Sequence, residues 1–255
     1  MIHRVPRTLS IFSWNIGNPS LLRATRQGEW LRKRIEDVFV LSETKDSDGC
    51  RFLEQYFRAY GYHVVFPKPR ENGYGVMIVS RQPVAESGFA QHSDFLPERV
   101  VAAHVPLGEE TLEIIGVYVP SRDASPQKIS RKKVFLEHLQ SALKTAPPSE
   151  FRIFCGDFNI LEPDHIPHYT FFRDWEYAFY RNLTENNLSD SFRHLNESVR
   201  EYSWVGRTGD GYRYDHCFVS QSMTPALQKC FYFHEPRRMR LSDHSALVME
   251  VGIKP

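Results

Sequence analysis

Polar side chains able to do chemistry recur in this sequence, and most of them close short apolar runs. They are, in chain order, Asn15, Glu43, Tyr118, Asp157, Asn159, Asp215, Asp243 and His244. Side chains at strand ends converge on one edge of a sheet, where a site can form. Each residue alone is weak evidence, because an acidic residue at a strand end is more often a turn former. It is the collection that points to a functional site.

The types of these residues indicate a cation site with an acid–base group beside it. Carboxylate and amide oxygens are the ligands that hard divalent cations prefer. A histidine among further carboxylates suits proton transfer or charge stabilisation, and Tyr118 adds a neutral hydrogen-bonding group. Because no cysteine stands near them in motif spacing, the set fits Mg²⁺ or Mn²⁺ better than Zn²⁺.

Composition describes an ordinary globular chain of one domain, residues 1–255. The chain has 255 residues, 41% hydrophobic and 25% charged, and no Gly/Ser linker or low-complexity tract divides it. The net charge of +1 excludes binding of a polyanion by bulk attraction alone. Basic clusters at residues 23–34, 131–133 and 237–240 would have to supply such binding.

The apolar runs predict a fold in which strands outnumber helices. Strands are predicted at residues 9–14, 38–41, 62–66, 76–79, 100–105, 112–119, 151–155, 214–219, 230–233 and 246–251. Helices are predicted at residues 21–35, 49–60, 125–143 and 174–186. Strands and helices do not alternate strictly, so the pattern favours an α/β (α+β) fold with mixed or antiparallel sheets covered by helices.

The cysteines and the N-terminal sequence indicate the cellular compartment of the protein. Cys50, Cys155, Cys217 and Cys230 are widely spaced, and we expect four reduced thiols. The sequence has neither a signal-peptide core nor an apolar run of ~18 residues. We therefore expect a cytoplasmic monomer that does not contact membranes.

Nine short segments, in this order, resemble the endonuclease/exonuclease/phosphatase superfamily, in its exonuclease III and AP endonuclease-like branch. They are Ser13-Trp14-Asn15, Leu41-Ser42-Glu43-Thr44-Lys45, Gly73-Tyr74-Gly75-Val76 running to Ser80-Arg81, Tyr118-Val119-Pro120, Gly156-Asp157-Phe158-Asn159, Asp190-Ser191-Phe192-Arg193, Tyr202-Ser203-Trp204, Arg213-Tyr214-Asp215 and Ser242-Asp243-His244. The resemblance implies a four-layered α/β sandwich: two mixed β-sheets packed face to face, with flanking helices outside and the site at one end between the sheets.

The resemblance also implies a role for each site residue. Glu43 would be the principal metal ligand, with Asn15 and Asp243 beside it. The cation, Mg²⁺ or Mn²⁺, would neutralise charge that develops on phosphate oxygens.

The remaining residues would act on the water and the phosphate. Asp157 would orient or deprotonate the attacking water, and Asn159 would hold that water or the phosphate. His244, bonded to Asp215, would stabilise the phosphate, and Tyr118 would donate to the phosphate or leaving group. The division between base and stabiliser stays open.

Five further residues are expected to contact the substrate: Trp204, Arg213, Arg237, Arg238 and Arg240. Trp204 is equally consistent with a core position or with a wall against a base or sugar. The cluster of residues 237–240 precedes the Ser-Asp-His motif, so it lies either near the substrate's phosphates or in a solvated loop.

This sequence departs from the family pattern at three positions, which lie around the substrate and not at the metal. Ser121 replaces the Asn of Tyr-x-Pro-Asn, Val205 replaces a second Trp, and Phe179 stands where a Trp is expected. The hydrolytic residues are complete, while residues expected around an abasic-site substrate are replaced.

The residues and the resemblance leave three alternative functions. The first is a DNA endonuclease or exonuclease of repair type, which cleaves phosphodiesters by metal-assisted in-line attack of water. The second is a phosphatase or phosphodiesterase that uses the same site on a small or lipid phosphate. The third, a catalytically inactive binding module, predicts a broken site.

Overall fold

Two six-stranded mixed β-sheets form the centre of the computed structural model, which describes residues 7–70, 72–107 and 109–253. The first sheet has the order β13-β14-β1-β2-β4-β3, with bounds Leu227–Phe233, Ala246–Ile253, Arg7–Asn15, Val38–Thr44, Gly75–Ser80 and His63–Val65. The second has the order β5-β6-β7-β8-β12-β9, with bounds Ala85–Glu86, Val100–Leu107, Glu110–Tyr118, Arg152–Asp157, Asp215–Ser220 and Leu188–Asp190. In each sheet one central pair is parallel, β1 with β2 and β7 with β8, and the other pairs are antiparallel.

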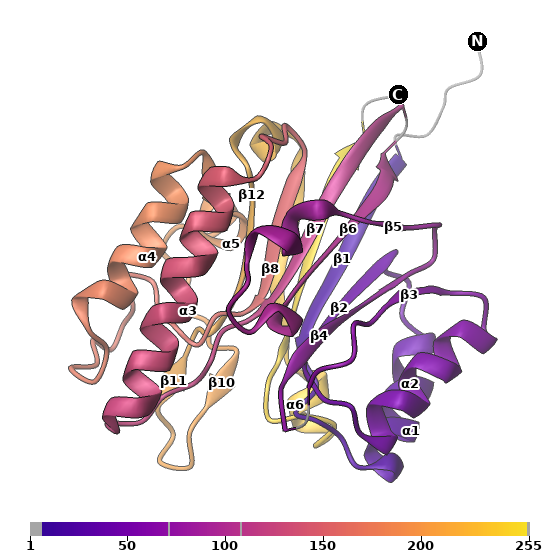
Figure 1. Cartoon of the computed structure of the whole chain (residues 1–255), viewed down its shortest axis with the longest axis horizontal. Helices are drawn as coiled ribbons and strands as arrows, with labels where there is room; N and C mark the ends of the chain where they lie inside the picture. Colours follow the sequence, from indigo (N-terminus) through magenta and orange to yellow (C-terminus); the bar gives the residue numbers. More distant parts are fainter. Residues whose placement is uncertain (1–6, 71, 108, 254–255) are drawn as a thin grey trace.

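The helices cover the outer faces of both sheets. α1 (Leu21–Arg32) and α2 (Asp48–Ala59) lie outside the first sheet, while α3 (Pro126–Thr145) and α4 (Asp174–Glu185) lie outside the second (Figure 1). The short helices α5 (Ser191–Leu195) and α6 (Glu235–Arg238) and the hairpin of β10 (Trp204–Val205) and β11 (Gly211–Tyr212) fill the connections. The order helix, sheet, sheet, helix confirms the predicted four-layered sandwich.

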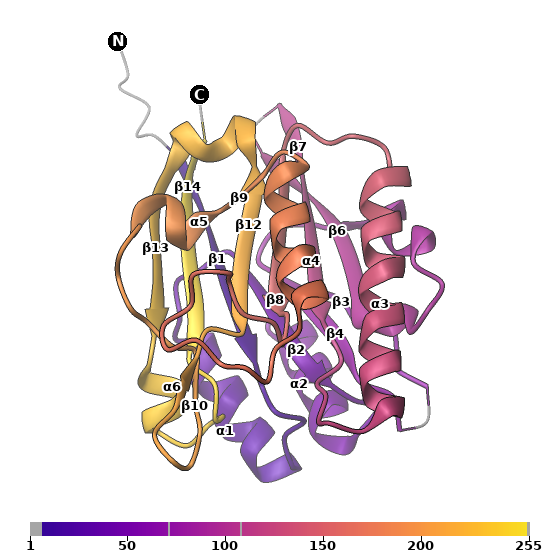
Figure 2. The same cartoon turned by 90° about the vertical axis from the view of Figure 1, so that its left-hand side faces the viewer.

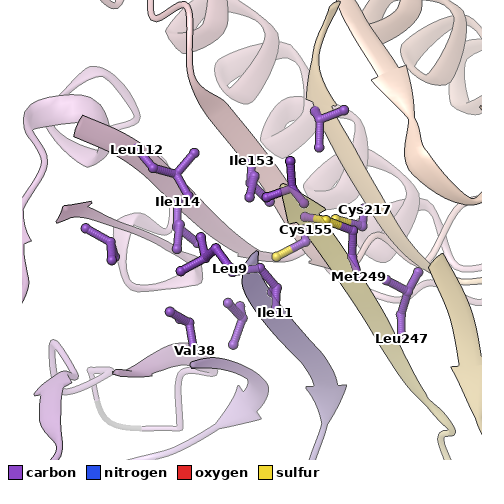
Figure 3. Close-up of a cluster of buried hydrophobic side chains, with 14 of the residues drawn as sticks. Leu9, Ile11, Val38, Leu112, Ile114, Ile153, Cys155, Cys217, Leu247 and Met249 are labelled. Carbon is purple, nitrogen blue, oxygen red and sulfur yellow. The ribbon is translucent and has the colours of Figure 1, made fainter. Parts of the chain in front are cut away.

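Alternation along the strands buries both faces of each sheet. In β1, Leu9 and Ile11 point into the cluster between the sheets, whereas Phe12 and Trp14 point into the cluster beneath α1 and α2. Figure 3 shows the first cluster, in which Leu9 and Ile11 of one sheet lie near Ile153 and Cys155 of the other. All four cysteines are free and buried, as expected.

The predicted strands and long helices are all present, and only short elements were missed. Each of the ten predicted strands overlaps one in the structure, and the four predicted helices match α1 to α4. The missed strands are two or three residues long, and the missed α-helices have four or five. Such segments are too short to show a period of their own.

Several connecting segments lie together at one end of the sandwich. α6 and the β10–β11 hairpin lie at the end opposite to that where β1 begins and β14 finishes (Figures 1 and 2). β1, β7 and β8 finish at Asn15, Tyr118 and Asp157, three of the predicted site residues.

We expect substitution of Gly116 by Ala to destabilise the sandwich, because the two sheets approach closely there. A Cβ at Gly116 of β7 would lie 2.7 Å from Cγ1 of Val40 and 2.8 Å from Cγ1 of Val76, both in the first sheet. Overpacking of this kind costs about 1–3 kcal/mol. Urea unfolding should show that loss for Gly116→Ala. Gly88→Ala, where an added Cβ meets nothing within 4 Å, is the control and should change stability by less than ~0.5 kcal/mol. Equal stability of the two variants would contradict the close approach.

Candidate active site

Strand register brings three of the predicted residues into one row across the second sheet. Tyr118 pairs with Asp157 in the parallel β7–β8 ladder, and Asp157 pairs with Asp215 in the antiparallel β8–β12 ladder. Cys155 and Cys217, two positions away in β8 and β12, point into the inter-sheet cluster. Since side chains alternate along a strand, Asp157 and Asp215 face the same way, toward the first sheet.

A β-bulge redirects Glu43 from the first sheet. Val38 and Val40 of β2 point between the sheets, so simple alternation would turn Glu43 outward. The ladder with β4 shifts between Ser42 and Thr44, and Glu43 takes a positive φ of 57°. A bulge of this kind re-aims a side chain, and strained backbone is concentrated at functional sites.

Asn15 connects the two sheets through hydrogen bonds. Its Nδ2 donates to Oε2 of Glu43 at 2.9 Å and to Oδ2 of Asp157 at 2.8 Å. Its Oδ1 accepts a bond from the Gly17 backbone amide at 2.8 Å. In this arrangement Asn15 acts as a donor that holds two carboxylates in place, and its expected role as a metal ligand stays a prediction.

The turn after β8 fixes the orientation of Asp157. Gly156 has φ of 142°, and a Cβ there would lie 2.0 Å from the carbonyl oxygen of Val117, so only glycine fits. Asn159 has a positive φ of 49°, which lets its backbone amide donate to Oδ1 of Asp157 at 2.8 Å. The side-chain amide of Asn159 donates to the Val119 carbonyl at 3.0 Å.

His244 and Asp215 form a buried pair. Nδ1 of His244 lies 2.8 Å from Oδ2 of Asp215, and Nε2 lies 4.0 Å from Oδ2 of Asp157. Ser203, for which the sequence predicted no role, fixes the strand by accepting hydrogen bonds from the backbone amides of Tyr214 and Asp215 at 3.0 and 3.1 Å. Asp215 therefore orients the imidazole so that its free nitrogen faces Asp157.

Burial and mutual charge shift the pKa values of this group. Burial, together with the charge of Asp215, raises the pKa of Asp157 to about 7, against the opposing effects of His244 and the bonds from Asn15 and Asn159. For His244, burial lowers the pKa, but the adjacent Asp215 and the charge of Asp157 prevail and raise it to about 10. In this arrangement the imidazole is therefore a cation near neutral pH, while Asp157 is a carboxylate of unusually high basicity.

Burial also raises the pKa of the third member of the row, Tyr118, and the charges of Glu43 and Asp157 add to the effect against Arg99. The phenol therefore stays protonated and remains a hydrogen-bond donor.

The chemistry of the donor set suits a divalent cation bound at Glu43 and Asp243. Glu43 is half-buried and Asp243 exposed, and neither makes an ion pair with a basic side chain within the described part of the chain. Asp157, Asp215 and Asp243 act on the imidazole of His244, and Asn15 joins Glu43 to Asp157, so this end of the sandwich carries an excess of negative charge that a cation relieves. Oxygen donors of this kind match Mg²⁺ or Mn²⁺.

Asp157, Asp215 and His244 also lie close enough together to hold a metal, with ligand atoms within 4.8 Å of one another. Hydrogen bonds already engage these ligand atoms, however: Asp215 is bonded to Nδ1 of His244, and Asn15 and the Asn159 amide donate to the two oxygens of Asp157. Glu43 and Asp243 are therefore the better candidates for the metal ligands.

Trp204 lies beside the metal candidates and is only partly buried. Its Nε1 donates to Oδ2 of Asp243 at 2.9 Å, and its ring lies 5.4 Å from that of Tyr212. The side chain therefore positions a ligand candidate and also forms part of an aromatic wall. Arg238 and Arg240 are exposed and Arg237 is half-buried. Arg237 and Arg238 belong to α6, which lies at the same end of the sandwich as the β10–β11 hairpin (Figure 2).

The expectation that Arg213 binds substrate is wrong. Its side chain is fully buried, and Nη2 donates to Glu162 at 2.6 Å and to Asp190 at 2.7 Å. A guanidinium enclosed in this way has no access to a substrate. It instead ties the start of β12 to the end of β9, because a buried charge must be paired.

An acidic cluster around one histidine, at the end of a two-sheet sandwich, defines a phosphoesterase of the metal-dependent class. The model of the Endonuclease/Exonuclease/phosphatase family matches residues 12–244, so the chain belongs to this family. Among curated relatives, exodeoxyribonuclease III of Haemophilus influenzae is 28% identical over 76% of this chain and 81% of its own length.

Two solved structures resemble this one throughout. The 3′ phosphatase NExo from Neisseria, bound to a product DNA hairpin, has a TM-score of 0.80 and 25% identity, covering 95% of this chain and 99% of its own. An AP endonuclease from Archaeoglobus fulgidus has a TM-score of 0.78 and 26% identity, covering 94% and 98%. Within the described residues, no helix has the length and hydrophobicity needed to cross a membrane.

The buried ion pairs of Arg213 lead us to expect a loss of stability in acid. Burial opposes ionisation of Glu162, but its bonds to Arg193 and the charge of Arg213 prevail and lower its pKa from 4.5 to about 2. A lowered carboxylate pKa contributes stability that is complete above pH 4.5 and is lost as the pH falls toward 2. The shift corresponds to roughly 3 kcal/mol.

Unfolding of the wild type and of Glu162→Gln at a series of pH values from neutral to acid tests this linkage. The variant should be less stable at neutral pH and should lose less stability in acid. Glu185→Gln, which removes an exposed carboxylate of α4, is the control and should follow the wild type. Parallel curves for the wild type and Glu162→Gln would exclude the linkage.

Proposed function

We propose that this protein is a Mg²⁺-dependent nuclease of DNA-repair type that hydrolyses phosphodiester bonds, with Mn²⁺ as a possible substitute. The observation that carries the proposal is the division of one site into two parts, bridged by Asn15. Glu43 and Asp243 offer oxygen ligands, whereas Asp157 and His244 offer a base and a cation. We further propose that residues 1–255 form a single domain that works as a cytoplasmic monomer on DNA.

The bound cation would supply positive charge to phosphate oxygens and to the leaving group. Asp157, with its raised pKa, accepts a proton from water held beside it, and the amide bonds from Asn15 and Asn159 keep its oxygens oriented. His244 directs Nε2 toward the same place and stabilises the negative charge that develops on the phosphate. Tyr118 remains protonated and donates a hydrogen bond to the phosphate or leaving group.

DNA is the favoured substrate because the similar proteins act on it. The relative from Haemophilus influenzae is named an exodeoxyribonuclease, and the Neisseria structure contains a DNA hairpin. Trp204 and Tyr212 provide partly exposed rings suited to contact with a base or sugar, and Arg237, Arg238 and Arg240 provide charges suited to phosphates. A phosphatase acting on a small or lipid phosphate would need the same metal and base.

A substrate panel tests the proposed function. Duplex DNA with an abasic site, 3′-recessed duplex, single-stranded DNA, RNA and a phosphoinositide are incubated with Mg²⁺ or with EDTA. We expect cleavage of at least one DNA and none with EDTA. Asp157→Asn and His244→Ala should each lower the rate at least ~10²-fold, since each removes a group that acts on the reacting atoms. Glu185→Gln is the control and should keep the wild-type rate. Hydrolysis of the phosphoinositide with every DNA left intact would replace the proposal with the phosphatase alternative.

The bond from Trp204 to Asp243 predicts a specific change in metal requirement. Trp204→Phe keeps an aromatic ring but removes the donor 2.9 Å from Oδ2 of Asp243. Loss of a partner that orients a metal ligand costs about 10-fold or more in metal affinity or activity. The Mg²⁺ concentration for half-maximal rate should rise by about this factor. Trp175→Phe, on α4, is the control and should leave it unchanged. An unaltered Mg²⁺ requirement in Trp204→Phe would remove this role.

A further inference from the structure

The side chain of Lys132 is buried, although its neighbours Arg131 and Lys133 suggest an exposed basic cluster. Its side chain is only 1% exposed, and α3 directs it beneath the turn that carries Asn159. Nζ donates to the backbone carbonyl of Asn159 at 2.6 Å and to Oε1 of Glu176 at 2.5 Å.

The ion pair with Glu176 does not by itself explain why Lys132 is buried here. Glu176 is already paired, because the guanidinium of Arg122 donates to its Oε2. The cluster thus holds two cations around one carboxylate, and both cations are almost fully enclosed. Burying a surplus ammonium is costly, so its second contact must be considered.

That second contact is with the backbone of a site residue in the left-handed region. Asn159 has φ of 49°, a conformation that L-residues other than Asn and Asp seldom adopt. In this conformation its amide holds Oδ1 of Asp157, and its side chain reaches the Val119 carbonyl. The carbonyl of Asn159 faces inward, where Lys132 satisfies it with a charged hydrogen bond.

We propose that Lys132 is a positioning residue for the hydrolytic reaction, because it holds the Asn159 backbone in the conformation that orients both Asn159 and Asp157. Glu176 is its charge partner and has no direct part in this role. The inference rests on the proposed nuclease function for its kinetic test, but the structural role can be measured without any substrate.

The test compares three variants of the full-length protein. Lys132→Met removes the ammonium and leaves the Arg122–Glu176 pair balanced. Glu176→Gln leaves the ammonium on the Asn159 carbonyl but removes the negative charge. Arg152→Met is the matched control, since Arg152 is also a buried cation, paired with Glu113 at 2.7 Å, but lies at the opposite end of β8 from Asp157.

Kinetics on the DNA that the wild type cleaves should distinguish misplacement of the catalytic groups from a loss of protein stability. Lys132→Met should lower kcat by about 10- to 100-fold with KM changed less than ~3-fold, as expected for misplaced catalytic groups. Glu176→Gln and Arg152→Met should lose stability yet keep kcat within ~3-fold. If Lys132→Met retains the wild-type kcat, or if kcat simply follows stability across the three variants, the proposal is overturned.

Hydrogen exchange gives a second measurement that needs no cleavage. Backbone amides of residues 157–161 should exchange at least ~10-fold faster in Lys132→Met than in the wild type, and at the wild-type rate in Arg152→Met. Equal protection of this segment in Lys132→Met overturns the structural role. If Lys132→Met does not fold, Glu176→Gln decides: a fall in kcat that follows its loss of stability overturns the proposal. A wild type that cuts no DNA contradicts the proposed function alone, because the exchange measurement remains decisive for Lys132.

Discussion

The concentration of carboxylates at one end of the sandwich is the constraint on which the site depends. Glu43 comes from one sheet and Asp157 from the other, and the amide of Asn15 donates to both. Buried carboxylates must be hydrogen-bonded or neutralised, because otherwise burial would protonate them. The bulge at Glu43, the glycine before Asp157 and the imidazole of His244 all serve this arrangement.

The same constraint explains why the surroundings are rigid. Asp157 and Asp215 lie in paired strands with inward-facing neighbours in the core, so neither can move without disturbing the sheet. Buried ionic groups support the outside of the site, with Arg213 beneath β12 and Lys132 beneath the turn after β8. Such supports place catalytic groups within the narrow tolerances that hydrolysis requires.

The sequence predicts the strands and the main site residues because both depend on local pattern. Apolar runs define β1 and β8, and polar residues at their ends identify Asn15 and Asp157. The sequence does not predict the environment of residues whose partners are distant in the chain. Arg213 was expected at the substrate, but its environment is set by Glu162 and Asp190. In the same way, the burial of Lys132 depends on the Asn159 carbonyl, 27 residues later, and on Glu176, 44 residues later.

We propose that the metal binds at Glu43 and Asp243, while Asp215 holds His244 for chemistry. Binding of Mn²⁺, followed by electron paramagnetic resonance in the wild type, Glu43→Gln and Asp215→Asn, tests this claim directly. The claim predicts that Glu43→Gln loses the bound ion and Asp215→Asn retains it. Loss of the ion in Asp215→Asn, with binding intact in Glu43→Gln, would place the metal on the buried cluster of Asp157, Asp215 and His244 and contradict the claim.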